Sequence, residues 1–85
     1  MTEAMANALD FDEGRPYRIV RIEGGEGVRR RLFALGFHPG DRVAVTASGI
    51  LRGPVVLKNV DTGVSVAVGR GIAQKIIAEP ADERA

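Results

Sequence analysis

The segment Val28–Gly40 reads VRRRLFALGFHPG and contains the clearest structural pattern of the chain. Val28, Leu32 and Leu35 follow one another at i, i+4 and i+7, which places them on one face of an α-helix. Gly36 follows the last of them, where a left-handed residue commonly ends a helix. The segment therefore predicts a short helix over Val28–Leu35 with these three side chains turned toward a core.

A tight turn is expected directly after this helix, at His38-Pro39-Gly40-Asp41. Proline sets φ near about −65° at the second position of a turn, and glycine at the third accepts the positive φ that a type II turn requires. Beyond the turn, Val43, Val45 and Ala47 recur at every second position. This period of two is typical of a half-buried strand.

Four further stretches are rich in strand-forming residues and are separated by glycine- or proline-containing segments. They are Arg15–Glu23, Val55–Lys58, Val64–Val68 and Lys75–Glu79. The first loses its alternation at Ile22, as a β-bulge would cause, and Gly69–Gln74 is compatible with a brief helical turn. Because short strands with open edges invite aggregation, we expect about five of them to close into a small, mainly β barrel with one inserted helix.

The chain has 85 residues, which is room for one core. We expect residues 13–79 to form the domain, residues 1–12 a flexible N-terminal segment and residues 80–85 a polar C-terminal tail. No stretch approaches the roughly 18 apolar residues of a membrane-spanning helix, and the first ten residues lack the pattern of a signal peptide. The expected location is the cytoplasm.

Few residues of the chain are suited to chemistry. The chain contains one histidine, His38, and no cysteine. Transition-metal sites need several converging ligands, and nucleophilic catalysis needs a nucleophile beside a base. The glycines of Gly24-Gly25-Glu26-Gly27 do not form a phosphate loop, because Glu26 repels phosphate and no Lys-Ser/Thr pair follows. We expect a non-enzymatic domain with no cofactor, metal site or small-molecule substrate.

Two groups of residues are candidate partner-binding sites. Arg29 and Arg30 point outward from the predicted helix with Phe33 beside them, while Ile50 and Leu51 are bulky apolar residues in a loop bounded by glycines. Each group also has a purely structural interpretation. The arginines suit a solvated helix face, and the two apolar side chains could fold back over the mouth of the barrel.

The run Arg29-Arg30-Arg31 permits an alternative function, in which the barrel binds nucleic-acid phosphate. The formal net charge is only +1, and the aromatic residues are one tyrosine and three phenylalanines. Nucleic-acid modules usually combine a strongly basic face with aromatics that stack on bases, so this alternative is less favoured. The same shortage of aromatics disfavours an SH3 domain that binds proline-rich peptides.

The helix-to-turn segment resembles the signature of FeoA domains, with Arg31-Leu32, Leu35-Gly36 and Pro39-Gly40 at the matching positions. Gly53-Pro54 before a valine-rich strand and the closing Gly71–Ile76 extend the similarity. The resemblance implies an SH3-like β-barrel with an inserted helix. It also implies a cytoplasmic accessory role in ferrous iron uptake, with docking onto a FeoB-type membrane transporter that carries a GTPase domain.

Overall fold

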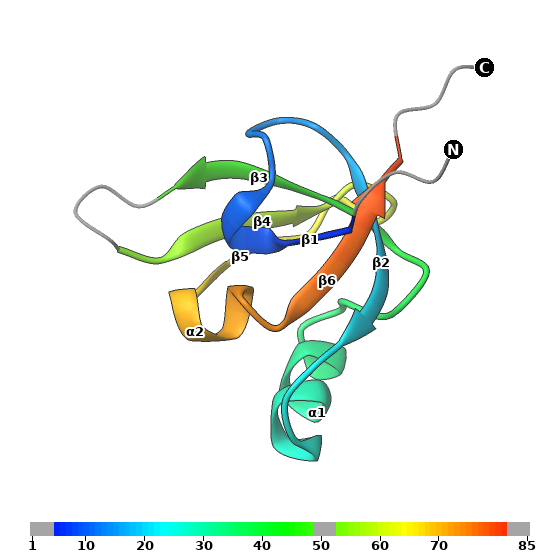
Figure 1. The fold of residues 1–85 in the computed structure, drawn as a ribbon, viewed down its shortest axis with the longest axis vertical. Helices are drawn as coiled ribbons and strands as arrows, with labels where there is room; N and C mark the ends of the chain where they lie inside the picture. Colours follow the sequence, from blue (N-terminus) through cyan, green and yellow to red (C-terminus); the bar gives the residue numbers. More distant parts are fainter. Residues whose placement is uncertain (1–4, 49–52, 82–85) are drawn as a thin grey trace.

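The computed structural model describes residues 5–48 and 53–81, which form one antiparallel sheet with a helix inserted between two of its strands (Figure 1). Within these residues no helix is long and apolar enough to cross a membrane. The elements in chain order are β1 (Ala6–Asn7), the 3-10 helix η1 (Ala8–Asp10), β2 (Tyr17–Ile22), α1 (Glu26–Ala34), β3 (Arg42–Ser48), β4 (Val55–Asn59), β5 (Ser65–Val68), α2 (Arg70–Ala73) and β6 (Ile76–Pro80).

The strand order is β1-β6-β2-β3-β4-β5, and every pairing is antiparallel. The mainly β architecture with one inserted helix is confirmed. The sheet nevertheless ends in two edge strands, β1 and β5, so its hydrogen-bonded ladder does not close into a continuous barrel as expected.

Two register shifts bend the sheet. One lies between Ile19 and Arg21, where β2 pairs with β6, and it confirms the bulge predicted in this strand. The other lies between Val45 and Ala47, where β3 pairs with β4. Because a bulge changes which side chains face inward, Ala47 is exposed, contrary to the period-two prediction, whereas Val45 is buried.

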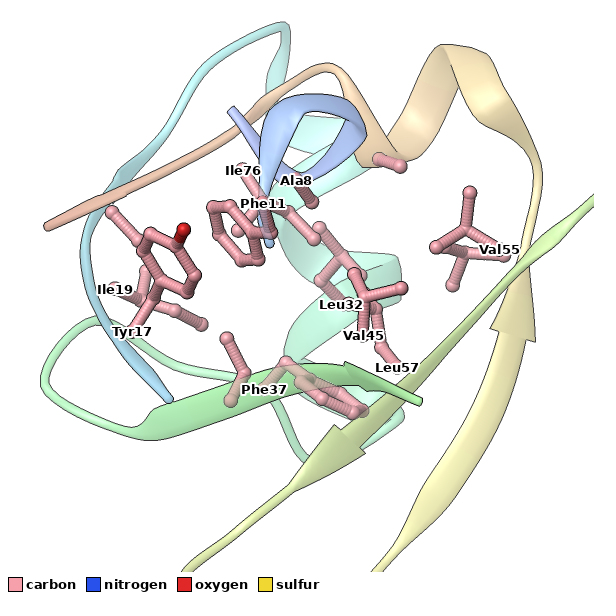
Figure 2. Packing of buried hydrophobic residues seen from close by; sticks show 14 of the residues in the cluster. Ala8, Phe11, Tyr17, Ile19, Leu32, Phe37, Val45, Val55, Leu57 and Ile76 are labelled. Atoms are coloured by element: carbon pink, nitrogen blue, oxygen red, sulfur yellow. The ribbon is translucent and has the colours of Figure 1, made fainter. Parts of the chain in front are cut away.

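The N-terminal region differs from the prediction of a flexible segment over residues 1–12. Strand β1 pairs with β6, and the side chains of Ala8 and Phe11 are only 2% and 8% exposed. The ring of Phe11 stacks on that of Tyr17, with 3.8 Å between centroids. Figure 2 shows the two side chains next to each other. Phe11 therefore anchors residues 6–11 to the core, although a two-residue strand and one helical turn are too short to produce a visible period.

The hydrophobic core is lined by strands β2 to β6, by η1 and α2, and by Leu32 of α1 (Figure 2). Its largest fully buried apolar side chains are Phe37, Ile19, Leu32, Leu57, Ile76, Val43, Val45 and Val55. Val28 is partly buried and packs against this cluster. The cluster brings together residues from nearly every element, so the described residues share one core.

The C-terminus of α1 has the predicted glycine cap. Gly36 adopts φ 96°, its N–H donates to the Phe33 carbonyl at 2.9 Å, and the N–H of Phe37 donates to the Leu32 carbonyl at 2.9 Å. These are the two bonds of a Schellman motif. The motif reverses the chain and directs Phe37 into the core. Leu35, which the periodicity placed inside, is instead 37% exposed because the helix ends before it.

The type II turn after the helix is also confirmed. The N–H of Asp41 donates to the His38 carbonyl at 3.0 Å, and Gly40 between them has φ 96°. The turn is attached to β2, because the N–H of Gly40 donates to the Ile19 carbonyl at 2.8 Å and the N–H of Ile19 donates to the Asp41 carbonyl at 2.9 Å. The end of α1 is thus joined to the sheet.

Asn59 is a buried polar residue, 0% exposed, and its side chain contacts three chain segments. Its Nδ2 donates to the Gly36 carbonyl at 2.9 Å and to Asp41 Oδ2 at 3.2 Å. Its Oδ1 accepts from the N–H groups of Asp61 at 2.9 Å and Thr62 at 3.1 Å. The amide therefore links the helix cap, the type II turn and the β4–β5 turn.

An ion pair between Arg42 and Asp61 lies at the same end of the sheet. Asp61 Oδ1 accepts from Nε and Nη2 of Arg42 at 2.9 and 2.7 Å, and its Oδ2 accepts from the Arg42 backbone N–H at 3.0 Å. The backbone hydrogen bond first, and then the guanidinium, lower the pKa of Asp61 below its usual value. Both side chains are about one-third exposed, so solvent screens the pair and limits its contribution to stability.

We predict that Leu32→Ala lowers the free energy of unfolding by about 2 to 4 kcal/mol, because it leaves a cavity in the core. Leu35→Ala should cost less than about 1 kcal/mol, since its side chain is partly in water. Urea denaturation of both variants and the parent measures the difference. Equal losses for the two leucines would contradict the assignment of Leu32 as the sole leucine anchor of α1.

Replacing Asn59 by leucine should destabilise the domain by about 2 to 4 kcal/mol, because it leaves the Gly36 carbonyl and two N–H groups without their partner. Thr62→Ala is the matched control, since it removes only an exposed hydroxyl that accepts from the Val64 N–H at 3.2 Å. Its cost should stay below about 1 kcal/mol. A stability of Asn59→Leu within about 0.5 kcal/mol of the parent would show that water replaces the amide.

Candidate docking surface

The outer face of α1 presents the helical part of the predicted binding surface. Arg29, Arg30 and Phe33 are all exposed, and positions three and four apart are neighbours on a helix surface. We call these three residues the outer helix face. Phe33 is 41% exposed, and its ring centroid lies 5.0 Å from that of His38. The structure thus brings two cations and one aromatic ring together in contact with solvent.

The two arginines of this face have only weak intramolecular partners. Arg30 Nη2 lies 3.4 Å from Glu26 Oε2, and both side chains are mostly exposed. Arg29 Nη1 donates to the Gly24 carbonyl at 3.1 Å. An exposed ion pair such as Arg30–Glu26 contributes little to stability, and the Arg29 hydrogen bond is also exposed, so both guanidinium groups can exchange these contacts for a partner's.

Ile50 and Leu51, the loop part of the predicted surface, lie outside the described residues. Their proximity to the outer helix face therefore stays a prediction.

A groove that sequence reasoning did not find lies on the other flank of α1. It has a volume of about 210 Å³ and runs between α1 and the β5–α2 segment. Its lining residues are Arg31, Leu32, Leu35, Ala67, Val68, Gly69 and Ile72. The exposed part of Leu35 faces this groove rather than the core. The groove could not be read from the sequence, because its two walls are more than thirty residues apart.

The polar groups near His38 serve the fold. Asp41 Oδ2 accepts from the His38 N–H at 2.8 Å and lies 3.4 Å from His38 Nδ1, while it also accepts from Asn59. Across residues 5–48 and 53–81, no group of three or more His, Cys, Asp or Glu side chains could hold a metal ion. The two flanks of α1 offer guanidinium groups and apolar side chains, which are contact groups for a partner.

Comparisons with known proteins relate this arrangement to a family. A model described as the FeoA domain matches residues 9–80. The putative Fe(2+) transport protein A of Methanocaldococcus jannaschii is 33% identical over 70 residues, which cover 82% of this chain and 80% of that one. A crystal structure of an iron uptake regulatory protein, FeoA, superposes with a TM-score of 0.80 at 26% identity and covers 92% of this chain and 99% of that one.

The same fold occurs in a larger protein. A manganese-dependent transcriptional repressor in complex with manganese has a TM-score of 0.83 at 21% identity, over 94% of this chain and 38% of the repressor. At that identity the likeness concerns the fold, and it agrees with the SH3-like architecture expected from the sequence. The family model and the Methanocaldococcus relative are decisive: this chain belongs to the FeoA domain family, whose members are small domains with a role in ferrous iron transport.

Proposed function

We propose that this domain is a cytoplasmic accessory module of ferrous iron uptake that docks onto a FeoB-type membrane transporter and modulates it. The observation that carries the proposal is the FeoA match over residues 9–80, which takes in β2 to β6 and both α-helices. Nearly all of the folded chain is therefore the family domain itself. A domain of this size has one packed core and acts through its surface.

The outer helix face is the proposed docking surface, together with Ile50 and Leu51. Interfaces concentrate their energy in a few aromatic and arginine anchors that exclude water on binding. Phe33 supplies exposed ring surface, and Arg29 and Arg30 supply cations whose present contacts are weak. Because these side chains lie outside the core, they can be replaced without unfolding the domain, which makes the proposal testable.

Nucleic acid is the alternative partner for Arg29, Arg30 and Arg31. A phosphate-binding surface releases counterions, so its affinity falls steeply and log-linearly with salt. A protein interface with Phe33 at its centre depends less on salt, because part of its energy comes from apolar burial. A salt series of binding measurements therefore separates the two partners.

We predict that the isolated domain does not bind ferrous iron tightly. The chain has one histidine and no cysteine, which are the side chains that most often hold transition metals. Anaerobic calorimetry with Fe(II) should show only weak binding. A single submicromolar site that raises the melting temperature, and loses that effect with a chelator, would contradict this prediction and give the domain a direct role in carrying iron.

Arg30→Glu and Phe33→Ala should each weaken binding to the cytosolic part of a FeoB-type transporter by about 1 to 3 kcal/mol, or roughly 5- to 150-fold. Fluorescence titration measures the dissociation constant after equal melting temperatures have been confirmed. Arg21→Glu is the charge-matched control, since this exposed arginine on β2 pairs with Glu23 at 3.1 Å outside the helix. If both helix variants bind like the parent, the outer helix face is not the docking surface.

A further inference from the structure

Strand β5 has a free edge, and its pairing with β4 determines which of its backbone groups point outward. It pairs only with β4, in the register Val55↔Val68, Leu57↔Val66 and their neighbours. At the turn end of this ladder the N–H of Asn59 donates to the Val64 carbonyl at 2.7 Å. Hydrogen-bonded pairs alternate in an antiparallel ladder, so the backbone groups of Val66 and Val68 face β4. Those of Ser65 and Ala67 face away from it.

The outward backbone groups of Ser65 and Ala67 form no turn, loop or cap hydrogen bond with the rest of residues 5–48 and 53–81. They are therefore free to pair with another chain. A free row of N–H and C=O groups is the template that strand addition uses. The other end of the sheet is the two-residue strand β1, which offers a shorter template.

The groove beside α1 adjoins this free edge. Ala67 belongs to both, and Val68 and Gly69 continue the groove toward α2. The opposite wall is Leu35, and Ile72 lies at its α2 end. Its volume of about 210 Å³ exceeds the roughly 150 Å³ of an apolar cavity that accepts benzene, so one large apolar side chain fits. A strand paired with β5 would turn every second side chain to one face.

The charges around the groove are positive. Arg31 lines it, and Arg70 lies between the lining residues Gly69 and Ile72. In the described part of the chain, neither guanidinium group has a hydrogen-bond or ion-pair partner, and both residues are exposed. No acidic side chain lines the groove. The complementary ligand therefore carries carboxylates on the same face as its apolar side chain, two positions away in an extended strand.

We propose that the β5 edge binds an extended protein segment by strand addition. An apolar side chain of that segment fills the groove between α1 and the β5–α2 segment, and an acidic side chain lies opposite Arg31 or Arg70. A second copy of this chain fits less well, because symmetric pairing of two β5 edges brings the same arginines of both copies together. The site is separate from the outer helix face. Its test therefore succeeds or fails independently of docking through Arg30 and Phe33.

The test uses the full chain and a capped seven-residue peptide, Thr-Glu-Thr-Leu-Thr-Glu-Thr, whose leucine and glutamates lie two positions apart and so share one face of a strand. In a ¹⁵N NMR titration we expect saturable shifts at Ser65, Ala67 and Ile72, and slower exchange of the Ser65 and Ala67 amide protons. The same peptide with lysine in place of glutamate should bind at least about tenfold more weakly, since it meets the arginines with like charge.

Two methylated peptides test backbone pairing with the unmodified protein. One carries N-methyl groups on the leucine and glutamate amides and the other on the threonine amides. Only one of these sets faces β5 in a paired strand, so one peptide should lose binding while the other retains it. Equal behaviour of the two peptides, or an absence of shifts up to millimolar peptide, would overturn strand addition.

Protein variants locate the site. Ala67→Pro removes an outward N–H and should abolish binding. Thr62→Ala, an exposed change outside the groove and the β5 edge, should retain it. Arg31→Glu should weaken the glutamate peptide and favour the lysine peptide. The methylated peptides remain decisive if Ala67→Pro does not fold. Concentration-dependent shifts at Ser65 and Ala67 without peptide would assign the edge to a second copy, and shifts confined to other strands would overturn the proposal.

Discussion

The hydrogen bonds of the Asn59 side chain hold together the end of the molecule from which α1 projects. This buried amide contacts Gly36 at the helix cap, Asp41 in the type II turn, and Asp61 and Thr62 after β4. An amide offers both donors and an acceptor, so one side chain can satisfy groups on two sides. Because Asn59 ties the end of α1 to the β4–β5 hairpin, the groove between α1 and β5 depends on this residue.

The parts of the fold that the sequence predicted well depend on local backbone preferences. The helix cap needs a positive φ at Gly36 and the type II turn needs one at Gly40, and both glycines adopt it. Leu35 and Phe37 are residues whose burial these local preferences did not predict. Periodicity places Leu35 on the inner face, but the chain reverses at Gly36 and Phe37 fills the core instead. The burial of Phe11 likewise depends on Tyr17, a tertiary contact that no local pattern indicates.

Of the two candidate surfaces, one could be predicted from the sequence and the other could not. Exposure of Arg29, Arg30 and Phe33 follows from their positions on one helix, and the structure confirms it. The groove requires Leu35 and Ile72, whose elements are far apart in sequence, to line one surface. The free edge of β5 beside the groove follows from the strand order. It was not predicted, because a closed barrel was expected and a closed barrel has no free edge. Surfaces made within one element were therefore predictable, and surfaces made between elements were not.

The inserted helix gives this small sheet two surfaces with different chemistry. A domain of 85 residues has little room for an enclosed cavity, so binding must use its outside. The repressor with the same fold, at 21% identity, shows that the architecture alone does not assign a function. What distinguishes this chain lies in side chains that the sheet does not need. Arginines flank α1 on both sides, with Phe33 on one flank and Leu35 on the other, so a single helix can present two anchors to one partner or to two.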